Sequence, residues 1–392
     1  MQIIPSKSDA HRALICAALS EKPCRVICET TSKDIEATKK CLAALKKGEE
    51  AMYCGESGST LRFLLPVMGA KGHKAAFYPE GRLPQRPLSP LYEELTAHGC
   101  RLSPQGSVPL TIEGQLQAGV YTLPGNVSSQ YISGLLFALP MLEGDSELHI
   151  QGFMESAPYV DMTATTLTQF GIRIEKTEYG YHIPGGQTYR APDAYEVEGD
   201  WSNACFFLTA GALTEGGIQV TGLNPDSLQG DRAVLELLSR FGAQVHQTAE
   251  GITVTPGRTL KPIRIDVSQI PDMTPALAAL ALAVPGKTEI TGAGRLRIKE
   301  SDRLAAITET VTALGGNIEE LADGLIIHGG TPLCGGVADS HNDHRIAMMA
   351  AIISLLCEDK VIIYGADAVK KSYPTFFETM KEAGLDYNIE RK

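Results

Sequence analysis

The chain has 392 residues, of which 43% are hydrophobic, and a formal charge of −11 at pH 7. This length predicts two domains rather than one, and the acidic balance argues against a surface that binds nucleic acid or an anionic membrane. Its nine cysteines form no C-x-x-C pair and lie mostly in apolar runs, which favours a reduced, intracellular protein over a disulfide framework or a zinc site.

No targeting or membrane segment is expected. The N-terminal residues lack the apolar region of a signal peptide. The longest apolar stretch begins at Pro275 and is too short to span a bilayer. We therefore expect a soluble, cytoplasmic protein.

Six short apolar runs, each preceded by polar residues typical of a helix start, recur along the chain. They begin near Ser8, Ser57, Ser128, Asp200, Asp272 and Asp343. Successive starts are 49, 71, 72, 72 and 71 residues apart. This regularity predicts a unit of about 71 residues that is present six times, with the first unit trimmed.

More amphipathic segments and short strand-like runs lie between these apolar runs. The amphipathic segments begin near Val160, Asp231, Asp302 and Pro374, and the strand-like runs include IQVTG, GITVTP and GLIIHG. Each unit is therefore interpreted as strands plus two helices, with three units in each of two similar domains. No G-x-G-x-x-G follows a strand, and the unit is too long for an eightfold β/α barrel.

Polar side chains gather at the six predicted helix starts. N-capping accounts for a serine or an aspartate at such a position. It does not account for Lys7, Arg12, Arg62 and Arg345, because a cation in the first turn opposes the helix dipole. Free N–H groups at helix N-termini favour anions, so we expect an anionic ligand at these starts.

Eight motifs in a fixed order carry a resemblance to a known family. They are PSKSDAHRAL, SGSTLR, LPQRP, VSSQYISGLL, IPDMTPALA, RIKESDRL, NDHRIAMM and KSYPTFF. In these motifs the chain resembles the 5-enolpyruvylshikimate-3-phosphate synthases over nearly its whole length. The resemblance implies an α/β fold of two inverse α/β barrel domains, each of three βαβαββ units. The first domain is expected over residues 7–198 and the second over 199–392, with residues 1–6 pairing with the second.

The resemblance also implies an activity. The expected enzyme transfers the enolpyruvyl (carboxyvinyl) group of phosphoenolpyruvate to the 5-hydroxyl of shikimate 3-phosphate and releases phosphate. This is a step of the shikimate pathway to chorismate and the aromatic amino acids. The family resemblance implies a cytoplasmic monomer without a cofactor or a metal, and no cluster of residues has metal-ligand spacing.

The family motifs assign residues to each substrate. The residues expected to bind 3-phosphoshikimate are Lys7, Ser8, Arg12, Ser128, Ser129, Gln130, Ser156, Tyr159, Asp272 and Lys299. The residues expected to bind phosphoenolpyruvate are Lys7, Gly58, Arg86, Gln130, Arg303, Arg345 and Lys371. Planar guanidinium groups suit this ligand because they bind carboxylate and phosphate in a bidentate manner.

Four residues, Lys7, Asp272, Lys299 and Glu300, are expected to be catalytic. Asp272 would act as the base at the hydroxyl, with Lys299 as its charged partner. Glu300 would carry the proton at the methylene carbon. Two alternatives stay open at this point, namely that Asp272 is only a helix N-cap and that Glu300 is only a surface residue. His344 would orient ligands or the loop of Arg345, and His11 would be structural.

Two rival functions and two departures from the family pattern accompany this prediction. UDP-N-acetylglucosamine enolpyruvyl transferases share the fold but use a lysine–asparagine pair and a reactive cysteine, and GRLPQRP contains no cysteine. A non-catalytic homologue is the second rival. Pro5 stands where the family has glycine, and Glu56 stands where many members have asparagine.

Overall fold

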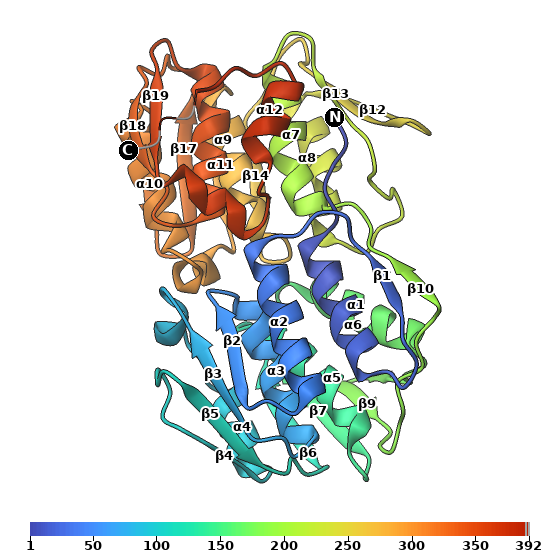
Figure 1. Cartoon of the computed structure of the whole chain (residues 1–392). Helices are drawn as coiled ribbons and strands as arrows, with labels where there is room; N and C mark the ends of the chain where they lie inside the picture. The colour runs from blue at the N-terminus through green and yellow to red at the C-terminus, as the bar shows by residue number, and fades with distance from the viewer. Residues whose placement is uncertain (389, 391–392) are drawn as a thin grey trace. The chain divides into compact units, whose positions relative to one another are not determined.

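The computed structural model describes residues 1–388 and 390, and the chain divides into two compact units. We call Lys7–Val197 the N-terminal unit. The C-terminal unit consists of Glu198–Lys392 together with Met1–Ser6. Figure 1 shows the elements of both units along the chain.

Both units are built from helices and small sheets. The helices of the N-terminal unit are α1 (Lys7–Leu19), α2 (Lys33–Lys47), α3 (Gly58–Ala70), α4 (Leu91–Ala97), α5 (Ser129–Ala138) and α6 (Ala157–Gln169). Its strands are β1 (Arg25–Ile27), β2 (Ala51–Gly55), β3 (Ala75–Pro79), β4 (Cys100–Leu102), β5 (Leu110–Gly114), β6 (Val120–Pro124), β7 (Ser146–Gln151), β8 (Glu175–Thr177), β9 (Gly180–Ile183) and β10 (Ala194–Glu196).

The C-terminal unit repeats this composition. Its helices are α7 (Trp201–Leu213), α8 (Val234–Phe241), α9 (Thr274–Leu282), α10 (Arg303–Ala313), α11 (His344–Ile353) and α12 (Phe376–Glu382). Its strands are β11 (Ile218–Val220), β12 (Gln244–Thr248), β13 (Gly251–Thr255), β14 (Arg264–Asp266), β15 (Gly286–Thr291), β16 (Asn317–Leu321), β17 (Gly324–Gly329), β18 (Gly336–Asp339) and β19 (Val361–Tyr364). Short 3₁₀ turns include η1 (Leu83–Gln85), η4 (Pro271–Met273) and η5 (Gly294–Ile298).

Three four-stranded sheets share one topology. Their strand orders are β2-β3-β5-β4, β6-β7-β9-β8 and β14-β15-β17-β16. In each sheet the first two strands are parallel, and the last two form an antiparallel hairpin that pairs with the second strand. The sheet β11-β13-β12 follows the same pattern, with a parallel bridge from Gln2 to Thr221 in place of a full first strand. The predicted βαβαββ unit is therefore present in these four places.

The remaining two of the six predicted units are shorter, and the first of them is the unit that the sequence predicts to be trimmed. The sheets β1-β10 and β18-β19 each consist of one parallel pair, and in the described part of the chain neither has a hairpin. Helix α2 runs directly into β2, the first strand of the next unit. This missing hairpin explains why the first spacing is only 49 residues.

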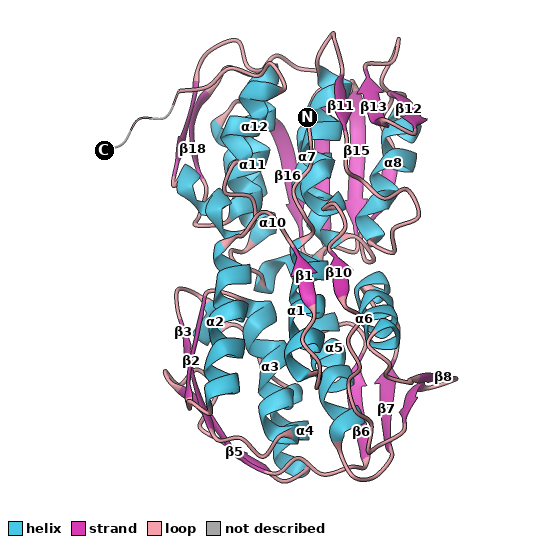
Figure 2. Ribbon diagram, turned by 45° about the vertical axis from the view of Figure 1, so that its right-hand side comes forward, coloured by secondary structure: helices cyan, strands magenta, loops and turns pink. Residues whose placement is uncertain are grey.

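The six apolar helices predicted from the repeat form the inside of each unit, and the sheets lie on the outside (Figure 2). Every residue of α9 is buried, as is nearly all of α7, because a helix that is apolar all round must be enclosed. Helix α8 instead buries one face through Val234, Leu237, Leu238 and Phe241. Each unit has its own hydrophobic core, and the fold is that of two inverse α/β barrel domains.

Residues 1–6 pair with the C-terminal unit. The backbone N–H of Ile3 donates to Thr221 at 3.0 Å, and that of Ser6 donates to Glu198 at 2.7 Å. Pro5 forms an isolated antiparallel bridge with Gly199. The hydrogen bonds beside this bridge use the N–H of Ser6 and the carbonyl of Ile4, so the missing N–H of proline is not needed.

Candidate active site

The C-terminal unit contains a cluster of charged side chains centred on Arg303. Its Nη1 donates to Asp272 at 2.8 Å, and its Nη2 donates to Glu300 at 2.7 Å. Its Nε donates to Asp343 at 2.7 Å. The Arg303 side chain is only 2% exposed, so one buried guanidinium group joins three carboxylates.

Arg345 and Lys299 complete this cluster around Asp272. Nη2 of Arg345 lies 3.3 Å from Oδ2 of Asp272 and donates to Ser202 at 2.7 Å, while Nη1 donates to the Asp272 carbonyl at 3.0 Å. Nζ of Lys299 lies 3.6 Å from Oδ1 of Asp272. Three cations therefore face three carboxylates, and their formal charges balance.

The start of each local helix positions these groups. Asp343 caps α11 by accepting the N–H of Arg345 at 2.9 Å, and the same carboxylate accepts from Arg303. Asp272 instead lies in the 3₁₀ turn η4, and α9 begins two residues later at Thr274 without a side-chain cap. Asp272 is therefore not an N-cap. Glu300 is not an isolated surface residue either, because its side chain is 20% exposed and pairs with Arg303.

Burial and neighbouring charges shift the pKa values of this cluster. Burial acts to raise the pKa of Asp272, but Arg345, Lys299 and Arg303 outweigh it and hold the pKa well below the ordinary value. Burial lowers the pKa of Lys299 to about 8, although Asp272 opposes the shift. At neutral pH Asp272 is thus a carboxylate, and Lys299 is a cation that loses its proton at a lower pH than an ordinary lysine.

Lys371 lies beside the turn that precedes α11. This buried lysine donates from Nζ to the carbonyl of Asn342 at 2.5 Å. His341 and Asn342 both have left-handed backbones, with φ values of 50° and 54°. Such conformations are uncommon for residues other than glycine, and here they direct the Asn342 carbonyl toward the lysine.

In the N-terminal unit, Arg12 joins α1 to α6. Its Nε donates to Thr163 at 2.8 Å, and its two terminal nitrogens donate to the carbonyls of Ser8 at 2.5 Å and Tyr159 at 2.6 Å. The guanidinium group also lies over the ring of Phe63, 5.4 Å from its centroid. Burial lowers the pKa of Arg12 to about 10, so the group stays charged at neutral pH.

Other residues of this unit have partners from neighbouring elements. Lys7 forms a 2.9 Å ion pair with Asp34. Ser128 caps α5 by accepting the N–H of Gln130, and Nη1 of Arg62 donates to the side-chain oxygen of Gln130 at 2.8 Å. Ser129 is buried in the first turn of α5. Ser156 is also buried and has a left-handed backbone, with φ of 55°, at the start of α6.

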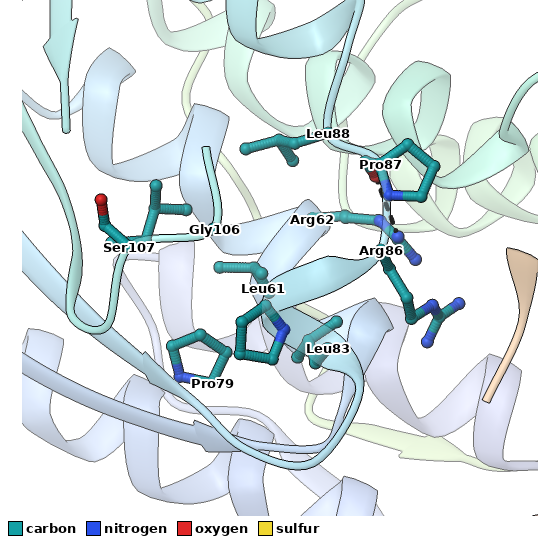
Figure 3. Close-up of a pocket in the computed structure, with 11 residues that line it drawn as sticks. Leu61, Arg62, Pro79, Leu83, Arg86, Pro87, Leu88, Gly106 and Ser107 are labelled. Carbon is teal, nitrogen blue, oxygen red and sulfur yellow. Dashed lines mark hydrogen bonds between the residues drawn. The ribbon is translucent and has the colours of Figure 1, made fainter. Parts of the chain in front are cut away.

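Gly58 begins α3 directly against Arg86. A Cβ atom at Gly58 would lie 2.9 Å from Nη1 of Arg86 and 2.9 Å from Nη1 of Arg62. The two arginines also line one side of a pocket whose other lining residues include Leu61, Leu83 and Leu88 (Figure 3). Nη2 of Arg62 donates to the carbonyl of Pro87 at 3.2 Å, as the dashed line in Figure 3 marks. A side chain at position 58 would therefore require the guanidinium groups of Arg86 and Arg62 to shift.

Comparisons with known proteins decide the family. A family profile described as EPSP synthase (3-phosphoshikimate 1-carboxyvinyltransferase) matches residues 46–380. The chain belongs to the EPSP synthase family. It is 43% identical to the 3-phosphoshikimate 1-carboxyvinyltransferase of Clostridium kluyveri over 98% of this chain and 94% of that protein. It is also 43% identical to the protein of the same name from Clostridium acetobutylicum, over 98% and 95% of the two chains.

Solved structures agree with this assignment. The EPSP synthase of Acinetobacter baumannii has a TM-score of 0.80 and 28% identity, with 98% of this chain and 95% of that chain covered. The enolpyruvyl transferase NikO from Streptomyces tendae shares the fold, with a TM-score of 0.77 at 18% identity and coverage of 98% and 94%. The two barrel domains described above are therefore those of an EPSP synthase fold.

Within this EPSP synthase fold, the site residues predicted from sequence fall into local groups. In the C-terminal unit Asp272, Lys299, Glu300, Arg303 and Arg345 adjoin one another, and Lys371 lies at the turn before α11. In the N-terminal unit Ser8 and Tyr159 contact Arg12 through their backbone carbonyls. Their roles toward substrates stay predictions.

The cations at the helix starts, for which an anionic ligand is expected, each have a protein partner in this structure. Lys7 pairs with Asp34, Arg12 bonds to carbonyl groups, and Arg345 pairs with Asp272. Arg62 likewise donates to Gln130 and Pro87.

Several residues that hold this arrangement together are not among the site residues predicted from the sequence. Asp343 is predicted only as a helix start, and Asp34, Ser202 and Thr163 are absent from the prediction. Each contacts a predicted site residue from another helix or loop. Only Asp343 had a sequence signal, because it lies in the NDHR motif.

Among the described residues, no group of three or more His, Cys, Asp and Glu side chains is arranged to hold a metal ion. Within the same residues, no helix is both long and apolar enough to cross a membrane.

Proposed function

We infer that this chain is an enzyme that transfers the enolpyruvyl group of phosphoenolpyruvate to the 5-hydroxyl of shikimate 3-phosphate and releases phosphate. The observation that carries this conclusion is its 43% identity, over 98% of its length, to proteins named 3-phosphoshikimate 1-carboxyvinyltransferase. The reaction belongs to the shikimate pathway, which leads to chorismate and the aromatic amino acids.

The reaction is an addition followed by an elimination. The 5-hydroxyl oxygen attacks C2 of phosphoenolpyruvate and loses its proton, while the methylene carbon gains a proton. In the second stage the methyl carbon loses a proton, and the bond between C2 and the phosphate oxygen breaks. The protein must therefore bind two anions, move protons at an oxygen and at a carbon, and stabilise the leaving phosphate.

We propose that Asp272 is the base at the hydroxyl and that Glu300 moves the proton at carbon. In the structure Asp272 is a weak base, because Arg345, Lys299 and Arg303 lower its pKa. Arg303 and Arg345 are also proposed to bind the carboxylate of phosphoenolpyruvate. A substrate carboxylate at these arginines would offset their charge and raise the pKa of Asp272. Binding of one substrate would thus strengthen the base that acts on the other.

The cationic residues proposed for the phosphate of phosphoenolpyruvate are Lys7, Arg86 and Lys371, and the backbone at Gly58 is proposed to lie close to the same substrate. Gln130, which Arg62 holds by a 2.8 Å hydrogen bond, would also contact this substrate. Three serines would surround the phosphate of 3-phosphoshikimate, namely Ser128, Ser129 and Ser156. Lys7, Ser8 and Arg12 would bind the same substrate, with Gln130 and Tyr159 against its ring and Asp272 and Lys299 at its hydroxyl.

We also propose that the enzyme acts as a monomer in the cytoplasm and binds no nucleic acid. The acidic net charge of −11 supports the last point. Light scattering on the purified chain would measure the mass in solution. A dimer at micromolar concentration would contradict the monomer.

One assay separates this function from its rivals. The purified chain is mixed with phosphoenolpyruvate and either shikimate 3-phosphate or UDP-N-acetylglucosamine, and released phosphate is measured together with product mass. We expect phosphate and an enolpyruvyl product only with shikimate 3-phosphate. Turnover with the nucleotide sugar would favour the other transferase, and no turnover with either acceptor would favour a non-catalytic homologue.

A further inference from the structure

A buried histidine outside the proposed set of substrate ligands begins a chain of hydrogen bonds in the N-terminal unit. Nδ1 of His11, in α1, lies 2.8 Å from the hydroxyl of Thr38 in α2. That hydroxyl lies 2.6 Å from the hydroxyl of Thr60 in α3. Thr60 in turn donates to the hydroxyl of Ser57 at 2.7 Å, and Ser57 is the N-cap of α3. All four side chains are at most 1% exposed.

The direction of these bonds follows from counting protons. Thr60 has one hydroxyl proton and donates it to Ser57, so the bond between the threonines must be donated by Thr38. Thr38 has then used its own proton and can only accept from His11. The Nδ1 atom of His11 therefore carries the hydrogen, and the chain runs in one direction from His11 to the cap of α3.

The protonation state of His11 agrees with this direction. Burial, together with the nearby charges of Lys7 and Arg12, holds the pKa of His11 well below its ordinary value. The ring is thus neutral and has a single N–H group. Its Nε2 atom has no hydrogen-bond partner among the described residues, as expected if that nitrogen has a bare lone pair.

The two threonines behave differently from others in the fold. A threonine inside a helix commonly donates to the carbonyl four residues earlier, as Thr166, Thr308 and Thr379 do at 2.9 Å each. Thr38 instead donates to Thr60 in the neighbouring helix α3, and Thr60 donates to the hydroxyl of the N-cap of its own helix. Without an N–H donor at position 11, the Thr38 hydroxyl would be free to rotate and donate to a backbone carbonyl of its own helix. Its hydrogen bond to Thr60 would then be lost.

We propose that His11 is a positioning residue that fixes the first turn of α3 through Thr38, Thr60 and Ser57. The cap hydroxyl of Ser57 accepts both the backbone N–H of Thr60, at 3.3 Å, and its hydroxyl. Gly58 is the first residue of α3 and lies against Arg86. The chain of hydrogen bonds therefore sets the place of Gly58 relative to that arginine. The consequence for substrate rests on the proposed function, since it needs phosphoenolpyruvate to bind there.

The test compares variants that break the chain of hydrogen bonds with variants that preserve it. His11→Leu and Thr38→Val remove a link, whereas His11→Asn keeps an N–H donor and Thr38→Ser keeps the hydroxyl. We expect the first pair to raise KM for phosphoenolpyruvate about three- to tenfold, as the loss of one hydrogen bond would, with kcat and KM for shikimate 3-phosphate changed less than about twofold. The second pair should match the unmodified protein, and the double variant His11→Leu with Thr38→Val should be no worse than the more impaired single variant.

Hydrogen exchange provides a readout that does not depend on activity. Amide exchange at residues 58–61 of the full chain should be faster in His11→Leu and Thr38→Val, and unchanged in His11→Asn and Thr38→Ser. The proposal fails if His11→Asn is as impaired as His11→Leu, or if exchange in this turn is the same in all four variants. If the unmodified chain shows no transfer activity, the proposed function fails, and the exchange comparison still decides the role of His11.

Discussion

The ammonium group of Lys299 lies 3.6 Å from the carboxylate of Asp272, and burial lowers the pKa of this lysine to about 8. Lys299, the charged partner of the proposed base Asp272, therefore loses its charge within a pH range in which enzymes are routinely assayed. This proximity gives a direct way to test the role of the pair.

We expect kcat/KM to fall as the pH rises through about 8, because Lys299 then loses its charge. Lys299→Arg should move this alkaline limb upward, since arginine stays protonated above pH about 12. The measurement is a pH profile of both proteins with saturating shikimate 3-phosphate. If kcat/KM of Lys299→Arg falls at the same pH as that of the unmodified protein, the fall is due to another group.

The same pKa shift affects folding. Between pH about 8 and the ordinary lysine value of 10.5, the unfolded chain binds more protons at position 299 than the folded chain. The contribution of Lys299 to the free energy of unfolding should therefore rise with pH in this window. Urea unfolding at several pH values, compared with Lys299→Met, would measure it.

Asp272→Asn should lower kcat by roughly 10²–10⁴-fold, because a base acts mainly in the transition state. Calorimetry should show that shikimate 3-phosphate still binds, with its affinity weakened by less than about tenfold. The assignment of Asp272 as base is wrong if binding disappears while saturated turnover persists.

Gly58→Ala should weaken binding of phosphoenolpyruvate, because the added methyl group would lie 2.9 Å from Nη1 of both Arg86 and Arg62. We expect its KM to rise roughly tenfold with little change in KM for shikimate 3-phosphate. Gly216→Ala is the control, since no atom lies within 4 Å of a Cβ atom there. Equal effects of the two substitutions would refute the crowding argument.

Arg303→Met should destabilise the protein by roughly 3–5 kcal/mol, because three carboxylates would lose the buried guanidinium group that joins them. Arg264→Met is a matched control that removes an exposed ion pair with Glu289, for which we expect at most about 1 kcal/mol. Denaturant unfolding of the full chains measures both. Similar unfolding midpoints would show that the cluster does not stabilise the fold.

Thiol reagents should leave activity intact. Cys334 is exposed, whereas Cys16, Cys54 and Cys205 are buried and have pKa values raised by burial. We expect alkylation of Cys334 first, followed by mass spectrometry, without loss of turnover. Inactivation that follows the modification of one cysteine and is prevented by substrate would favour the alternative function, that of a UDP-N-acetylglucosamine enolpyruvyl transferase.

The fold was predictable from sequence where the pattern was strong. The apolar runs at intervals of 71–72 residues predicted the six inner helices, because only an enclosed helix can be apolar on all sides. The two incomplete units were harder to predict. A missing hairpin can be recognised in the sequence only when it shortens the distance between successive apolar runs, as between Ser8 and Ser57.

The candidate site was predictable as a set of residues, but its contacts were not. Arg303 and Asp343 are 40 residues apart in the chain, yet their side chains meet at 2.7 Å. Asp34 pairs with Lys7 across 27 residues, and nothing in its local sequence marks it. Such partners depend on how helices pack, and a single sequence gives residue types and local periods but not these pairings.

The attachment of residues 1–6 to the C-terminal unit has a consequence for synthesis on the ribosome. The N-terminal unit is continuous from Lys7 to Val197 and can complete its fold while the rest of the chain is still being made. The first six residues emerge before it but must wait for Thr221 to obtain a partner. Residues 1–6 are thus translated before the N-terminal unit but obtain their partners after it, so substitutions in this segment would act on a late step of folding.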